Sequence, residues 1–136
     1  MSAATLTDAA KALLDEPVIA NLATIGSDGS PHVTPVWIDV EGDDLVINTA
    51  DGRAKVQNLR HRPKVAVSVV DPHDPYRVLA VQGVVTEITD RDADAHIDRL
   101  AHKYLGVDTY PMRKPGERRL KVVIKPERIL MQPTDG

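Results

Sequence analysis

The chain has 136 residues, of which 17 are Lys or Arg and 20 are Asp or Glu, so its formal net charge is −3. This length fits one domain with a single core, and we expect residues 1–136 to form it. Because the chain contains no cysteine, a disulfide, a zinc–thiolate site and a thiol nucleophile are all excluded. The apolar runs are far shorter than the roughly 18 residues that a membrane span needs, and the N-terminus is too polar for a signal peptide. We therefore expect a cytoplasmic protein.

The composition and the turn signals predict a β-rich fold. Seventeen residues are valine, and β-branched side chains suit strands. Turn sequences around Gly29 and Gly42 separate the apolar or alternating runs 18–25, 33–40 and 45–49, which predicts two successive hairpins. Further strands are predicted over residues 64–70, 77–89 and 120–131. Gly83 lies where a bulge would bend the second of these.

Three segments are predicted to be helical. Thr7 is a suitable cap for a short helix that ends before Pro17, and residues 53–61 are bounded by turn sequences on both sides. The third helix is predicted to begin at the capping residue Asp90 and to end at Gly106. The order of elements is not an alternating βαβ pattern, so we expect a closed or partly open antiparallel barrel of about six strands with appended helices. Such a small barrel has a filled interior, which places any ligand beside a helix or at a subunit interface.

Positive charge is concentrated in residues 53–64. This segment holds five basic residues and no acidic one, and the rest of the chain then carries 12 basic and 20 acidic residues, a balance of −8. Arg53 and Lys55 fall in the first turn of the predicted helix, where the helix dipole disfavours cations. A bound anion, above all a phosphate, would relieve that conflict. The alternative is a solvated basic face beside acidic strands.

Other chemistries find less support in the sequence. His96 and His102 lie on roughly opposite faces of the third helix, so we expect surface or capping roles and no metal site. The serines lack the context of a nucleophile elbow. Almost no aromatic residues accompany the basic segment, which argues against a nucleic-acid partner. Trp37 is either a core anchor or a wall for a planar ligand, and the sequence alone favours the core.

Several motifs together resemble one family over nearly the whole chain. The family is that of the pyridoxamine 5'-phosphate oxidase-like split β-barrels, and the similarity is greatest to its actinobacterial branch, which uses the deazaflavin coenzyme F420. The order and the spacing of the motifs carry the resemblance: Leu22-Ala23-Thr24-Ile25, Asp28-Gly29-Ser30-Pro31-His32-Val33-Thr34-Pro35-Val36-Trp37, Asn48-Thr49-Ala50, Gly52-Arg53-Ala54-Lys55, Asn58-Leu59-Arg60, Asp74-Pro75-Tyr76-Arg77, Val81-Gln82-Gly83, the segment 97–104, and Pro115-Gly116-Glu117-Arg118-Arg119.

The resemblance implies a mainly β, α+β fold, a six-stranded antiparallel split β-barrel with two or three peripheral helices. It also implies a homodimer with cofactor sites at the subunit interface and a small-molecule substrate. In the family the Arg-x-Lys turn binds the cofactor phosphate, and the second strand lies along the tricyclic ring. The cofactor-binding residues implied in this way are Thr34, Pro35, Val36, Trp37, Thr49, Arg53, Ala54, Lys55, Asn58, Tyr76 and Arg77. No catalytic proton donor is predicted.

The function implied by the resemblance is F420-dependent hydride transfer between the reduced deazaflavin and a small electrophile, such as an activated C=C, a C=N or a quinone. Two alternatives remain open. One is an FMN-dependent oxidase or flavin reductase of the same fold, because FMN and F420 both carry a phosphate on a ribityl chain. The other is a carrier that binds F420 without turnover.

Overall fold

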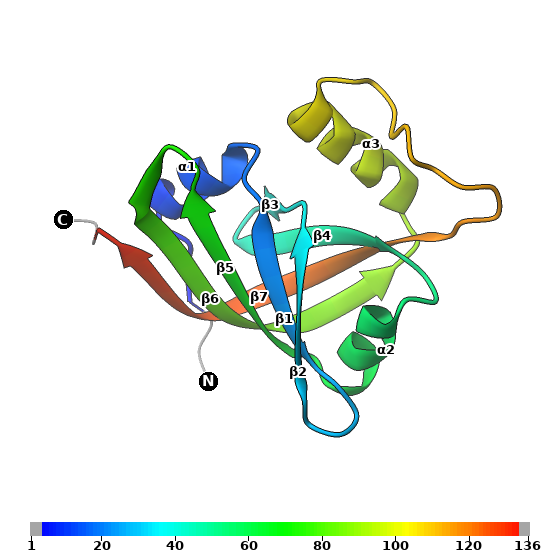
Figure 1. The fold of residues 1–136 in the computed structure, drawn as a ribbon, viewed down its shortest axis with the longest axis horizontal. Helices are drawn as coiled ribbons and strands as arrows, with labels where there is room; N and C mark the ends of the chain where they lie inside the picture. Colours follow the sequence, from blue (N-terminus) through cyan, green and yellow to red (C-terminus); the bar gives the residue numbers. More distant parts are fainter. Residues whose placement is uncertain (1–3, 134–136) are drawn as a thin grey trace.

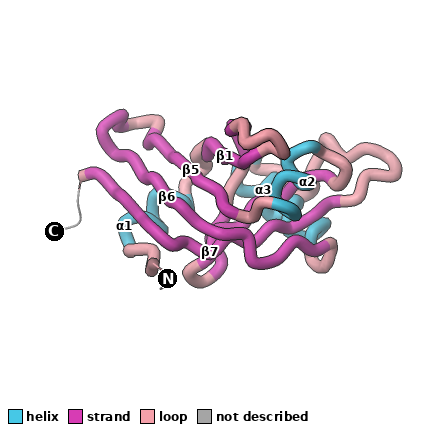
Figure 2. The backbone as a smooth tube through the Cα atoms, turned by 90° about the horizontal axis from the view of Figure 1, so that it is seen from below, coloured by secondary structure: helices cyan, strands magenta, loops and turns pink. Residues whose placement is uncertain are grey.

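The seven strands found in the described part of the chain belong to one antiparallel sheet. A computed structural model describes residues 4–133, and within them the strands follow the order β2-β1-β5-β6-β7-β4-β3 (Figure 1). Figure 2 shows β5, β6 and β7 crossing the molecule as one curved layer, with α1 at one end and α2 and α3 at the other. The strand bounds are β1 Ala20–Ile25, β2 Pro31–Val36, β3 Asp39–Glu41, β4 Asp44–Ala50, β5 Lys64–Asp71, β6 Asp74–Thr89 and β7 Arg119–Gln132.

The prediction of six strands is wrong by one because the alternating run 33–40 is broken. The chain leaves β2 after Val36 and enters β3 at Asp39, with Trp37 and Ile38 between them. β2 and β3 are the two edges of the sheet, so these two residues carry the chain from one edge to the other. The sheet must therefore curl until its edges approach. Since β2 and β3 do not pair with each other, the barrel is not closed by hydrogen bonds.

The bulge predicted at Gly83 is confirmed. The pairing of β6 with β7 changes register between Gln82 and Gly83, where β6 bends across the sheet. A Cβ atom on Gly83 would lie 2.8 Å from the carbonyl oxygen of Lys125 and 2.9 Å from Cγ2 of Ile124. Only glycine leaves room for β7 to approach this closely.

The three predicted helices all form. α1 spans Asp8–Asp15, and its first turn is capped by Thr7 Oγ1, which accepts from the Ala10 N–H at 3.1 Å. α2 spans Ala54–His61. α3 spans Ala93–Leu105 and ends at Gly106 in the left-handed conformation, as predicted. The prediction that Asp90 caps α3 is wrong, because Asp92 is the N-cap residue and makes no side-chain capping bond.

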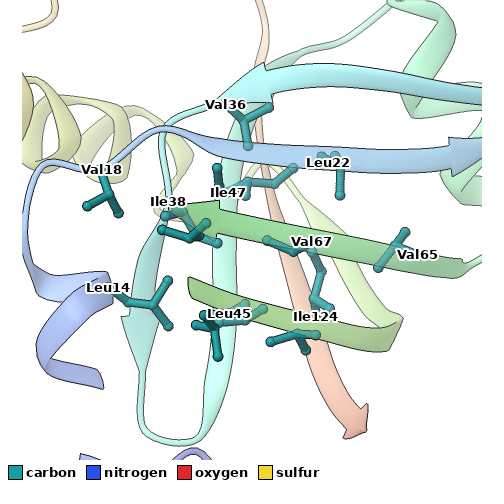
Figure 3. Packing of buried hydrophobic residues seen from close by; sticks show 14 of the residues in the cluster. Leu14, Val18, Leu22, Val36, Ile38, Leu45, Ile47, Val65, Val67 and Ile124 are labelled. Carbon is teal, nitrogen blue, oxygen red and sulfur yellow. The ribbon is translucent and has the colours of Figure 1, made fainter. Parts of the chain in front are cut away.

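The core fills the inside of the curled sheet. Leu22, Val36, Leu45, Val67 and other side chains from both halves of the sheet meet there, as Figure 3 shows. Further residues of α1 and of the segment after it complete the cluster. The interior therefore leaves ligands to the outer surface, as the sequence predicts. No helix within residues 4–133 is both long and apolar enough to cross a membrane.

Candidate functional site

The candidate site is built around the break between β2 and β3. The N–H of Ile38 donates to the hydroxyl of Tyr104 at 3.0 Å, and the carbonyl of Ile38 accepts from Nζ of Lys103 at 2.8 Å. The Tyr104 hydroxyl also donates to the carbonyl of Val18. Burial raises the pKa of Tyr104 to about 12, so the hydroxyl keeps its proton for this bond. Two side chains of α3 thus replace the strand partners missing at the break, and they fix the position of Trp37.

A cavity of about 330 Å³ opens beside this break, a volume at the lower end of the range for small-molecule sites. Its walls come from β2, β4, α2, α3, the start of β7 and the segments just before β1, β3, α2 and β7. The residues that line it are Ile19, Pro35, Val36, Trp37, Asn48, Arg53, Lys55, Ile97, Tyr110, Met112 and Arg119. The cavity combines cations with aromatic and apolar side chains.

Arg53 and Lys55 form the cationic wall at the start of α2. Arg53 is the N-cap residue but makes no capping bond, and the first turn holds no acidic residue. Within residues 4–133 neither side chain has an ion-pair partner. Burial lowers the pKa of Lys55, and the positive charges of Arg53 and Arg119 lower it further. A bound anion would supply the missing negative charge and reverse the effect of these neighbours.

Arg119 is a third cation at the cavity, and its position is fixed. Its side chain is only 4% exposed and pairs with the Glu117 carboxylate at 3.0 Å. Its Nε donates to Oδ1 of Asn48 at 2.9 Å. The guanidinium also lies over the ring of Tyr110, 5.2 Å from the centroid. These three contacts leave little rotational freedom, so Arg119 presents a preorganised charge.

Asn48 connects Arg119 to a buried histidine. Because its Oδ1 accepts from Arg119, its Nδ2 is the donor, and it lies 2.8 Å from the Ala93 carbonyl and 3.1 Å from Nδ1 of His96. His96 therefore accepts at Nδ1 and is neutral, with its proton on Nε2. Burial lowers the pKa of His96 to about 4. The expected surface or capping role of His96 is wrong, because this residue of α3 is fully buried.

Aromatic rings form the other part of the cavity wall. Trp37 stacks on Tyr104 with ring centroids 4.9 Å apart and an interplanar angle of 8°, and Tyr110 meets Trp37 edge to face at 6.0 Å. Trp37 is half-buried rather than a core residue. One side of its indole is therefore packed on α3 while the residue still lines the cavity.

The structure brings together five of the residues expected to bind a cofactor. Pro35, Val36, Trp37, Arg53 and Lys55 all line the cavity. Two more expected residues, Thr34 in β2 and the exposed Ala54 at the start of α2, neighbour lining residues in the chain.

Four expected residues lie outside the cavity lining. Thr49 is buried and its hydroxyl has no hydrogen-bond partner among residues 4–133, and Asn58 is buried and contacts Thr24. Tyr76 is 83% exposed, and Arg77 pairs with Glu16 at 3.0 Å at the end of α1. Their roles as cofactor contacts remain predictions.

Several lining residues were not predicted as site residues. Strand alternation would have identified Asn48: Leu45, Ile47 and Thr49 share one face of β4, which leaves Asn48 on the other face. The remaining ones are Ile19, Ile97, Tyr110, Met112 and Arg119. Tyr110 and Met112 belong to a stretch that reads as a surface loop, and only its folded path brings them to the cavity.

The comparison with protein families decides the relationship. The family model of pyridoxamine 5'-phosphate oxidase matches residues 6–132. The chain belongs to the pyridoxamine 5'-phosphate oxidase family. This confirms the resemblance that the sequence motifs indicate. No curated protein matches the chain.

Several solved structures resemble this chain over most of its length. An F420 reductase is 32% identical, covers 88% of this chain and 94% of its own, and has a TM-score of 0.78. A conserved hypothetical protein from Mycobacterium tuberculosis is 24% identical, with coverages of 96% and 87% and a TM-score of 0.72. HutZ, the haem storage protein from Vibrio cholerae, is 16% identical, with coverages of 94% and 95% and a TM-score of 0.66. The last two share the fold.

Proposed function

We propose that the protein is an oxidoreductase that binds coenzyme F420 and transfers a hydride between the reduced deazaflavin and a small electrophilic substrate. The observation that carries the proposal is the cation cluster of Arg53, Lys55 and Arg119 at one cavity with Trp37. The cluster fits a phosphate-bearing cofactor, since its first two members lack carboxylate partners in the described chain. The similarity to an F420 reductase supports a deazaflavin over a flavin.

Each cavity wall has a part in this proposal. Arg53 and Lys55 bind the phosphate, together with the first free N–H groups of α2 around Ala54. Pro35, Val36 and Trp37 lie along the ring system, and Thr34 neighbours them in the same strand. The bound cofactor supplies the hydride chemistry, and the chain supplies orientation and a fixed positive field. The cavity lining offers no carboxylic acid or histidine as a proton donor, so we assign proton delivery to solvent.

A homodimer is part of the proposal. Val33, Val70 and Tyr76 are 64%, 49% and 83% exposed, and exposed apolar side chains of this size favour a subunit contact. In a dimer, Tyr76 and Arg77 of one subunit would be available to the cavity of the other, and Thr49 and Asn58 would support the phosphate-binding turn from within the fold. Sedimentation of the purified protein measures the subunit number.

The decisive experiment is a titration of the cofactor-free protein with F420 and, separately, with FMN. Trp37 is the only tryptophan, so its emission reports binding at the cavity directly. We expect quenching by F420 and weaker binding of FMN. Lys55→Ala should weaken F420 binding by about 1.5–3 kcal/mol, the range for a hydrogen bond to a charged group. Its stability should not fall, because Lys55 has no ion-pair partner to lose among the described residues.

Lys64→Ala is the matched control, since Lys64 belongs to the same basic segment but lies outside the cavity lining. Equal F420 affinity in wild type, Lys55→Ala and Arg53→Ala would refute the phosphate site. Tighter binding of FMN than of F420 would select the flavin alternative. Tight F420 binding without hydride transfer to any of a panel of electrophiles would indicate a carrier.

A further inference from the structure

Lys55 is a half-buried lysine whose ammonium group has no ion-pair partner in the described part of the chain. The other half-buried lysines of residues 4–133 are all engaged. Lys11 and Lys121 pair with carboxylates at 3.1 Å and 2.9 Å, and Lys103 donates to two backbone carbonyls. Lys55 instead lines the cavity, where a ligand can reach its amine.

Both the burial and the neighbours of Lys55 favour its neutral form. Burial is the main cause that lowers the pKa of Lys55, and the positive charges of Arg53 and Arg119 lower it further. The cavity lining contains no carboxylate that would restore the charge. At neutral pH a larger share of Lys55 therefore carries a free lone pair than is the case for an ordinary lysine. Burial and a neighbouring cation are two conditions that make a lysine nucleophilic in proteins.

The two arginines beside Lys55 determine which electrophile reaches it. Arg119 is 4% exposed and is held by its ion pair with Glu117, whereas Arg53 has no carboxylate partner among the described residues. A phosphoryl group carries close to two negative charges at neutral pH, which these two guanidiniums match. Because the arginines compensate that charge, burial continues to favour the neutral amine of Lys55. An electrophile that carries a phosphoryl group is therefore bound next to a nucleophile.

We propose that Lys55 is a modification site that accepts the acyl group of an acyl phosphate bound by Arg53 and Arg119. The Lys55 nitrogen forms a bond to the acyl carbon, and the bond between that carbon and the phosphate oxygen breaks. Inorganic phosphate leaves with the electron pair and takes up the amine proton, so an uncharged amide remains on the side chain. Acylation thereby removes one of the three cations of the cavity. The loss of F420 binding that follows rests on the proposed function, whereas the acylation itself does not.

The test incubates the cofactor-free full chain with acetyl phosphate and measures acetylation of each lysine by peptide mass spectrometry. We expect the rate at Lys55 to saturate as the concentration of acetyl phosphate is raised, because the reagent binds before it reacts. Lys64 is exposed and belongs to the same basic segment but lies outside the cavity lining. Its rate should rise linearly and be about tenfold lower at low reagent concentration. Inorganic phosphate should slow the reaction at Lys55 and leave the reaction at Lys64 unchanged.

Arg53→Ala tests the binding step, because it removes one charge that holds the phosphoryl group and leaves Lys55 in place. Acetylation of Lys55 should slow about tenfold, the lower end for the loss of one hydrogen bond to a charged group. Arg60→Ala is the matched control, since Arg60 is an exposed arginine of α2 outside the cavity lining. Trace labelling with acetic anhydride, a neutral donor, separates reactivity from binding. As the pH rises, this labelling of Lys55 should level off below 10.5, the ordinary pKa of lysine.

The outcomes for Lys55 and for F420 can be told apart. A rate at Lys55 that rises linearly with acetyl phosphate and does not respond to inorganic phosphate would overturn the proposal. Equal acetylation of Lys55 and Lys64 would also overturn it. If Lys55 is acetylated as expected but neither F420 nor FMN binds, the proposed function fails and the modification site stands. If Lys55→Ala weakens F420 binding while acetylation does not favour Lys55, the modification site fails and the proposed function stands.

Discussion

Buried His96 should make the stability of this protein fall as the pH drops from about 6.5 to about 4. The side chain is fully buried, and burial is the main cause that lowers its pKa to about 4. The charges of Lys121 and Arg99 lower the pKa further, and Asp39 and Glu41 oppose them. Protonation would also place an N–H at Nδ1 opposite the Nδ2 donor of Asn48.

The direction in which stability changes with pH follows from the pKa values of His96 in the unfolded and folded states. Above the ordinary pKa of 6.5 the histidine is neutral in both states, so the native protein has its full stability. Below it, the unfolded chain binds a proton that the native state refuses, and stability falls until the folded pKa of about 4 is reached. A gap of this size corresponds to about 3 kcal/mol, at 1.36 kcal/mol for each pKa unit.

The assay is urea unfolding between about pH 7.5 and about pH 4.5 at one protein concentration, followed by Trp37 fluorescence and circular dichroism. His96→Gln keeps an acceptor for Asn48 but cannot titrate, so its stability should depend less on pH than that of wild type by about 2.5 kcal/mol over this range. His102→Gln, an exposed histidine on the same helix, is the control and should follow wild type. If the free energy of unfolding changed with pH equally in wild type and in His96→Gln, His96 would not be buried in its neutral form.

Two further predictions concern the fold around the site. Tyr104→Phe should lower the free energy of unfolding by about 1–3 kcal/mol, because the Ile38 N–H and the Val18 carbonyl lose their partner; urea unfolding measures this, and the exposed Tyr76→Phe should be neutral. Gly83→Ala should cost about 1–3 kcal/mol, because its Cβ would collide with the Lys125 carbonyl; an unchanged melting temperature would contradict the close approach of β7.

The sequence predicts the elements well where local patterns decide them. The alternation of Val65, Val67 and Val69 gives β5, and Thr7 and Gly106 mark a helix start and a helix end. The break at Trp37 and Ile38 could not be predicted, because the alternating run 33–40 continues through it. What ends β2 is the curl of the whole sheet together with two hydrogen-bonding side chains on α3, a long-range effect.

The sequence identifies the cavity residues whose charge is unusual for their position, and it misses those whose charge is balanced by a nearby partner. Arg53 and Lys55 stand out because cations at a helix start conflict with the dipole. Arg119 does not stand out, because its partner Glu117 lies two residues away and the pair reads as ordinary surface charge. Arg60 and Lys64 belong to the same basic run as Arg53 yet do not line the cavity.

The basic segment 53–64 contains one cation that stabilises the fold and another that is available to a ligand. Arg62 stabilises the structure, since its Nε donates to the Ile25 carbonyl at 2.7 Å and its guanidinium contacts Asn58. Lys55 has no such bond within the described part of the chain, and both its burial and its cationic neighbours disfavour its charge. A half-buried cation without a partner destabilises the ligand-free protein. Such a cation is typical of a binding site, where the ligand supplies the negative charge that the fold does not. The contrast between these two cations, seven residues apart, supports the proposed anion site at the start of α2 rather than along the whole basic segment.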